Sequence, residues 1–63
     1  MEKLIIILKQ MVEQGRTVEA ERLAEEIKGR LKMMIDSTDI DEDLVRLAKM
    51  QKIVGDLEQQ LKA

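Results

Sequence analysis

Hydrophobic and polar residues alternate along most of this chain with the period of an amphipathic α-helix. The most apolar stretch is residues 4–8, which read Leu-Ile-Ile-Ile-Leu. At about 100° per residue, the apolar side chains of residues 2–14 form one arc roughly 160° wide, and only Ile6 falls among the polar positions. The arc contains Leu4, Ile5, Ile7, Leu8, Met11 and Val12. We therefore predict a first helix over about residues 2–14.

This arc is wider than the stripe of about 100° that a single packing neighbour requires. A helix with so broad an apolar face usually contacts two neighbours. We expect the second neighbour to be another copy of the chain or a different protein. The expected dimer or partner interface comprises Leu4, Ile5, Ile6, Ile7, Leu8, Met11, Val12 and Met33.

A strand over residues 4–8 is an alternative, since a short apolar run also fits a buried strand. No other segment has a strand-like pattern. Such a strand would therefore have to pair with its own copy in a second chain, in a ribbon-helix-helix-like dimer.

We expect a break or a sharp kink at residues 15–17, between the first helix and a second one, in preference to one uninterrupted helix. Gly15 suits the left-handed position just past a helix end, and Thr17 is a candidate N-cap. The next segment, about residues 18–35, repeats apolar residues at alternating spacings of about four and three, as in a coiled coil. Its stripe is Ala20, Ala24, Ile27, Leu31 and Met34, with Leu23 beside it.

A polar turn at residues 36–39 precedes a third helix over about residues 40–62. Ser37, Thr38 and Asp39 are candidate caps for this helix. The acidic residues 41–43 then fall in its first turn, where the helix dipole favours negative charge. The apolar stripe is Leu47, Met50, Val54, Leu57 and Leu61, widened by Leu44 and Ile53.

These elements predict an all-α fold in one domain spanning residues 1–63, an antiparallel helical hairpin with a short N-terminal helix. The chain has 63 residues, no aromatic side chain and no Cys. A chain of this size buries only about 60% of the surface that its unfolded form exposes. Because disulfides cannot add stability here, we expect it to dimerise into a helical bundle.

Composition narrows the classes of partner. The chain carries 11 basic and 13 acidic side chains, a net charge of −2, which argues against a protein that coats nucleic acid. Residues 4–8 are too few for the roughly 7–15 residues of a signal-peptide core or the roughly 20 of a membrane span. We expect no membrane contact and a cytoplasmic location, which the lack of Cys fits.

The sequence offers no convincing catalytic, cofactor-binding or metal site. The acidic residues 39, 41 and 43 resemble the start of a calcium loop, but Leu44 replaces its Gly and Met50 its bidentate Glu. Without His or Cys, the candidate nucleophiles are Thr17, Ser37, Thr38 and lysines, and none has an evident activating base. We expect a protein that is not an enzyme and binds no cofactor.

Nucleic-acid binding is the main alternative function. Lys28, Arg30 and Lys32 form a basic run, but on a helix Arg30 points away from the two lysines. Residues 7–27 also match a helix-turn-helix in outline, although four Glu near the start of the second helix would repel phosphates. A Rop-like hairpin dimer is an analogy of architecture, with no shared motif.

The function that we predict is therefore a small non-enzymatic, homodimeric helical-bundle adaptor or regulatory protein that acts through protein-protein interaction. A secretion or phage accessory chaperone would be a special case of it. The alternative is a small nucleic-acid-associated regulator of the Rop-like kind, binding RNA or DNA.

Overall fold

The computed structural model describes residues 1–62 of the chain and contains three α-helices. They are α1 (Glu2–Glu13), α2 (Thr17–Ser37) and α3 (Asp41–Lys62). Their ends differ from the predicted 2–14, 18–35 and 40–62 by at most two residues. Residues 1–62 contain no strand, and residues 4–8 lie within α1. The all-α fold class is confirmed, and the strand alternative is wrong.

Gly15 ends α1 as the sequence predicts, with a left-handed φ of 74°. The amide of Gly15 donates to the carbonyl of Val12 at 3.1 Å, and the amide of Arg16 donates to that of Met11 at 3.0 Å. This pair of bonds is the Schellman motif, which satisfies the last carbonyls of a helix and reverses the chain. The first two helices are therefore separate elements.

Two of the three candidate hydroxyl caps, Thr17 and Ser37, do not cap a helix. Thr17 is the first residue of α2, not its cap, and its Oγ1 donates to the carbonyl of Gly15 at 3.5 Å. Ser37 belongs to the last turn of α2, where its Oγ donates to the carbonyl of Met33 at 2.9 Å. Hydroxyls can bond back to a carbonyl three or four residues earlier, and here that bond replaces a cap on α3.

The core lies along the facing sides of the three helices. Its fully or almost fully buried residues are Leu8 from α1, Ala20, Ala24, Ile27 and Leu31 from α2, and Leu47, Val54 and Leu57 from α3. All eight belong to the predicted apolar faces. The two alanines let α2 approach its neighbours closely, while the branched side chains fill the space between helices.

Three side chains that the sequence places on apolar faces are instead exposed: Ile7, Met34 and Ile53. Each lies at the edge of its apolar stripe. The exposure of a side chain at an edge depends on how far the neighbouring helix extends. In α2, the half-buried Ile35 packs against the core in place of Met34. The predicted stripes are thus correct at their centres and too wide at their edges.

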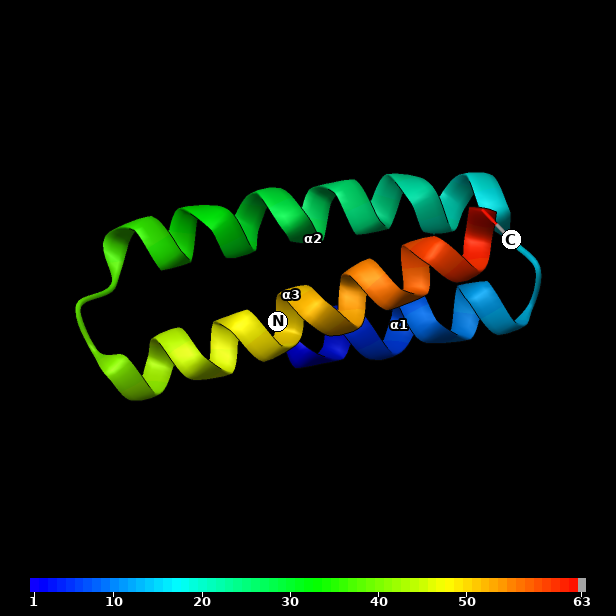
Figure 1. The fold of residues 1–63 in the computed structure, drawn as a ribbon. Helices are drawn as coiled ribbons and strands as arrows, with labels where there is room; N and C mark the ends of the chain where they lie inside the picture. Colours follow the sequence, from blue (N-terminus) through cyan, green and yellow to red (C-terminus); the bar gives the residue numbers. More distant parts are fainter. Residues whose placement is uncertain (63) are drawn as a thin grey trace.

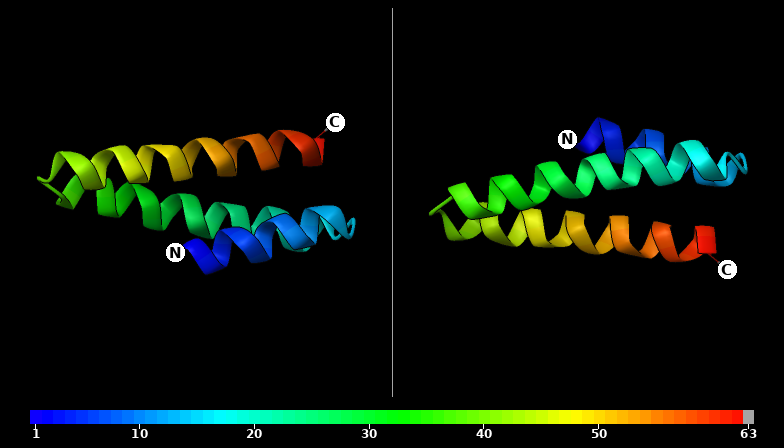
Figure 2. Two further views of the ribbon diagram at one scale, coloured as in Figure 1. Left: turned by 90° about the horizontal axis from the view of Figure 1, so that it is seen from below. Right: turned by 90° about the horizontal axis from the view of Figure 1, so that it is seen from above.

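Helices α2 and α3 lie side by side, whereas α1 covers only half of their length (Figure 1). The N-terminus lies near the middle of the molecule, and α1 runs from there toward the end where α3 finishes (Figure 2). The molecule is elongated, with extents of 37 × 19 × 15 Å. Within residues 1–62, the half near the turn between α2 and α3 therefore has two helices only, which we call the open half.

Candidate interaction surface

The residues predicted to form an interface fall into three groups in the structure. Leu8 is fully buried among the subunit's own helices and offers no surface to a partner. Leu4, Ile5, Met11 and Val12 are half-buried and pack against the core. Ile6, Ile7 and Met33 are exposed, Met33 by 73%. The surface available to a partner is therefore the outer side of α1, together with Met33 on α2.

One shallow groove lies between α1 and α3 and has mostly aliphatic walls. We call it the isoleucine groove; its apolar lining is Ile5, Ile6, Ile53 and Leu57, and its polar rim is Lys9, Asp56 and Gln60. Its volume is about 240 Å³. Ile6 and Ile53 are 57% and 47% exposed, so two large aliphatic side chains face solvent together.

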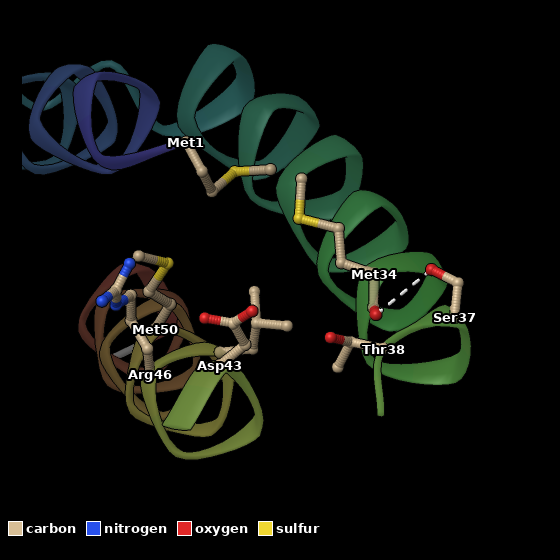
Figure 3. Close-up of a pocket in the computed structure, with 8 residues that line it drawn as sticks. Met1, Met34, Ser37, Thr38, Asp43, Arg46 and Met50 are labelled. Atoms are coloured by element: carbon tan, nitrogen blue, oxygen red, sulfur yellow. Dashed lines mark hydrogen bonds between the residues drawn. The ribbon is translucent and has the colours of Figure 1, made fainter. Parts of the chain in front are cut away.

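A larger pocket lies in the open half, where α1 begins. We call it the methionine pocket; it is lined by Met1, Met34, Leu47 and Met50, with Ser37, Thr38, Asp43 and Arg46 at its edges. Its volume is about 400 Å³. The side chains of Met1 and Met34 approach each other across it, and that of Met50 lies on the α3 side (Figure 3). Methionine side chains are flexible and polarisable, so such a pocket adapts to differently shaped apolar groups.

Sequence reasoning missed the methionine pocket. It assigned Met34 and Met50 to the interior stripes and placed Met33, but neither of these two, in the expected interface. The signal was present in the predicted lengths, since a first helix of about 13 residues cannot cover helices of about 18 and 23 residues from end to end. Comparing those lengths would have placed a gap over part of the second and third helices.

Two basic side chains in the middle of α2, Lys28 and Arg30, form ion pairs. The Lys28 Nζ lies 3.1 Å from Glu58 Oε1 on α3 and 3.9 Å from Glu25 Oε1, and the Arg30 guanidinium lies 2.9 Å from Glu26 Oε1. The hydrogen bond and the charge of Glu58, with the charge of Glu25, raise the pKa of Lys28 above its ordinary value.

These pairs bear on the nucleic-acid alternative. Phosphate binding requires basic groups whose charge is available to the ligand. Two of the three basic residues in the run 28–32 already have carboxylates beside them, and at the start of α2 Arg16 pairs with Glu19. The potential around both segments is therefore weaker than the sequence of basic residues suggests.

Thr17 and Ser37, two of the candidate nucleophiles, are exposed. No polar or charged side chain among residues 1–62 is buried, whereas catalytic groups are commonly tuned by burial. The hydroxyls of Thr17 and Ser37 are bonded to backbone carbonyls. No cluster of three or more His, Cys, Asp or Glu side chains in the described part of the chain has the geometry to hold a metal ion.

Two further findings concern membranes and relatives. None of the helices within residues 1–62 combines the length and the apolar composition needed to cross a bilayer. Comparisons with protein-family models, curated proteins and solved structures find no match to this chain.

Proposed function

We propose that this chain is a small non-enzymatic adaptor or regulatory protein, a helical hairpin with an added N-terminal helix, that works by binding protein surfaces. Its first partner is a second copy of itself, with which it forms a helical bundle. A different protein then binds whatever apolar surface the dimer leaves exposed.

The observation that carries this proposal is the outer apolar surface of a very small chain. The isoleucine groove and the methionine pocket border α1 along its α3 side and at its start; Ile6 is exposed at the groove and Met34 at the pocket. Ile7 is also exposed on α1. Contiguous apolar patches on small proteins commonly mark protein-protein contacts. Protein association is the simplest way to remove these side chains from water.

The absence of catalysis is part of the proposal. We base the proposal that the protein is not an enzyme on the polar side chains of residues 1–62, all of which reach solvent. The available hydroxyls are weak nucleophiles without a neighbouring base, and general acid-base catalysis needs a group whose pKa lies near the working pH.

Sedimentation velocity tests the self-association. We expect the pure protein at micromolar concentration to sediment as a dimer, with twice the chain mass of 7.3 kDa. Interference optics are required, because the chain has no aromatic side chain to absorb light. A folded monomer over the whole accessible concentration range would overturn the dimer.

Gel-shift experiments with pooled RNA and DNA separate protein binding from nucleic-acid binding. They are run at low salt, where phosphate contacts are strongest. We expect no retention, because Lys28 and Arg30 are paired with carboxylates. Retention that weakens steeply with added salt would overturn the proposed class of partner in favour of a nucleic acid.

A further inference from the structure

The lengths of the helices leave a gap of defined size. At 1.5 Å per residue, the 12 residues of α1 span about 18 Å, whereas the 21 and 22 residues of α2 and α3 span about 32 Å. About 14 Å of the α2–α3 pair therefore has no third helix in the described chain. The methionine pocket lies in this open half. The uncovered length of the α2–α3 pair is therefore close to the length of a second α1 helix.

The outer side of α1 has the complementary excess. Ile6 and Ile7 are exposed there, with Lys3 and Gln10 between them on the helical wheel. Nothing within the described chain covers this side. The same short helix thus lacks a neighbour on its outer face and leaves the open half of α2 and α3 uncovered.

We propose that a second copy of the chain covers both the outer side of α1 and the open half of α2 and α3, in an antiparallel two-fold dimer. Each α1 lies between its own α2–α3 pair and the open half of the other copy's pair. The two α1 helices then follow one another end to end through the centre of a bundle. This arrangement rests on the proposed self-association and specifies its geometry.

Two-fold symmetry makes the fit reciprocal. The axis passes beside the molecule near Met1, perpendicular to the helices and parallel to the face that carries α1. Rotation about it turns the second copy to face the first and reverses its direction. The half that holds α1 in one copy then meets the open half of the other. A two-fold interface always joins the same surface of both copies, so both methionine pockets are filled together.

The surface area agrees with an interface of ordinary size. A compact monomer of 7.3 kDa exposes about 4,200 Å², whereas this chain exposes 4761 Å². The surplus of about 600 Å² approaches the roughly 800 Å² that each partner buries in a standard stable complex. The elongated shape is the source of that surplus.

Charge favours the same pairing. The segment that borders the open half holds five acidic residues and no basic one between positions 36 and 43. None of the ion pairs within residues 1–62 involves these acids. In the dimer, Lys3 on the outer side of α1 approaches this acidic segment, and Asp43 at the rim of the other copy's pocket is its nearest candidate partner. Such complementarity fixes the direction of docking more than it adds affinity.

Substitutions at exposed positions test the interface. We expect Ile7→Asp and Met34→Asp each to weaken dimerisation by about tenfold or more. Val18→Asp and Val45→Asp are matched controls, because both valines are exposed, belong to α2 and α3, and do not line the methionine pocket. Circular dichroism establishes that each variant is still helical. If a control substitution weakens the dimer as much as Ile7→Asp does, the proposed geometry is wrong.

Cross-linking tests the direction of the dimer and does not depend on a destabilising variant. The chain has no Cys, so a single introduced Cys reacts alone. Mass-tagged Ile7→Cys is mixed with Met34→Cys and treated with a short bismaleimide. We expect mainly the mixed product. A mixture of Ile7→Cys with Val18→Cys serves as the control and should give only background.

The outcomes separate this inference from the proposed function. A folded monomer at every concentration overturns both. A dimer whose main product joins Ile7→Cys to Ile7→Cys overturns the antiparallel arrangement and leaves self-association standing. A dimer that gives the mixed product with Met34→Cys, and not with Val18→Cys, supports the arrangement.

Discussion

At the scale of single residues, Gly15 is expected to stabilise the fold, whereas Gly29 and Gly55 are expected to destabilise it relative to alanine. Gly15 has a φ of 74°, a conformation that costs an L-residue about 1–2 kcal/mol, whereas Gly29 and Gly55 are inside helices with nothing within 4 Å of an added Cβ. We predict that Gly15→Ala lowers the free energy of unfolding by about 1–2 kcal/mol. Gly29→Ala and Gly55→Ala should each raise it by about 0.5–1 kcal/mol. Urea unfolding followed by circular dichroism measures all three, and a neutral Gly15→Ala would contradict the role given to Gly15.

Leu8 and Ile6 are only two positions apart in the sequence, but their environments are opposite. Leu8 is fully buried, and Ile6 is 57% exposed. Leu8→Asp places an uncompensated charge in the core, which costs about 3–5 kcal/mol or more, against a total stability of about 3–9 kcal/mol for 63 residues. We predict that Leu8→Asp unfolds the chain, whereas Ile6→Asp keeps its helical content and weakens association. Circular dichroism and sedimentation on the same samples distinguish the two effects; equal unfolding by both would mean that α1 is buried on all sides.

The pattern of the sequence predicts the interior well at the centre of each stripe and poorly at its edges. Leu8, Ile27 and Val54 lie at stripe centres, and all three are fully buried. Met34 and Ile53 lie at edges and are exposed, Met34 at the methionine pocket and Ile53 at the shallow groove beside α1. A periodicity assigns a side chain to a face but does not report the length of the neighbour opposite it. The exposed part of the candidate surface was therefore predictable at Ile6 and Met33, and the methionine pocket was not.

At the scale of elements, the ion pair between Lys28 and Glu58 joins α2 to α3. Folding raises the pKa of Lys28 above 10.5 through the hydrogen bond and charge of Glu58 and the charge of Glu25. A raised pKa means that the folded state binds the proton more tightly. This stabilisation is complete below the unfolded value of 10.5 and is lost as the pH rises through the folded value. Because Lys28 is exposed, water screens the pair and its contribution is small.

We predict that the thermal midpoint of the natural chain falls more steeply above about pH 10.5 than that of Lys28→Arg, whose guanidinium stays charged. The other lysines are common to both chains, so the difference isolates this pair. Glu58→Gln should abolish the difference between Lys and Arg at position 28. Parallel curves for the natural chain and Lys28→Arg would mean that the pair contributes nothing to stability.

The elements themselves were accessible from sequence because their boundaries depend on local chemistry. The end of α1 follows from the left-handed preference of Gly15, and the first turn of α3 carries the acids that its dipole favours. Thr17 and Ser37 failed as caps because each hydroxyl bonds to a carbonyl that precedes it in the chain, that of Gly15 and that of Met33. Which carbonyl a hydroxyl reaches is decided by the path of the backbone through the turn, which a pattern of residue types does not specify.

At the scale of the whole molecule, folding and self-association should be linked. If the two α1 helices pack between two α2–α3 pairs, part of the apolar core exists only in the dimer, and mass action then stabilises the folded state as concentration rises. We predict that the thermal midpoint increases by roughly 10 °C for a hundredfold rise in protein concentration. Circular dichroism in cells of different path length measures this.

The combined Ile7→Asp and Met34→Asp substitutions should remove this concentration dependence, because both positions face the other copy in the proposed dimer. Val18→Asp should retain it, since Val18 is 63% exposed at the far end of α2. The comparison is between slopes and not between midpoints, so a variant that lowers the stability of the single chain does not imitate loss of the dimer. A natural chain whose midpoint is constant over the hundredfold range would mean that its three helices are stable without a partner, and the exposed side of α1 would then be a surface for a different protein.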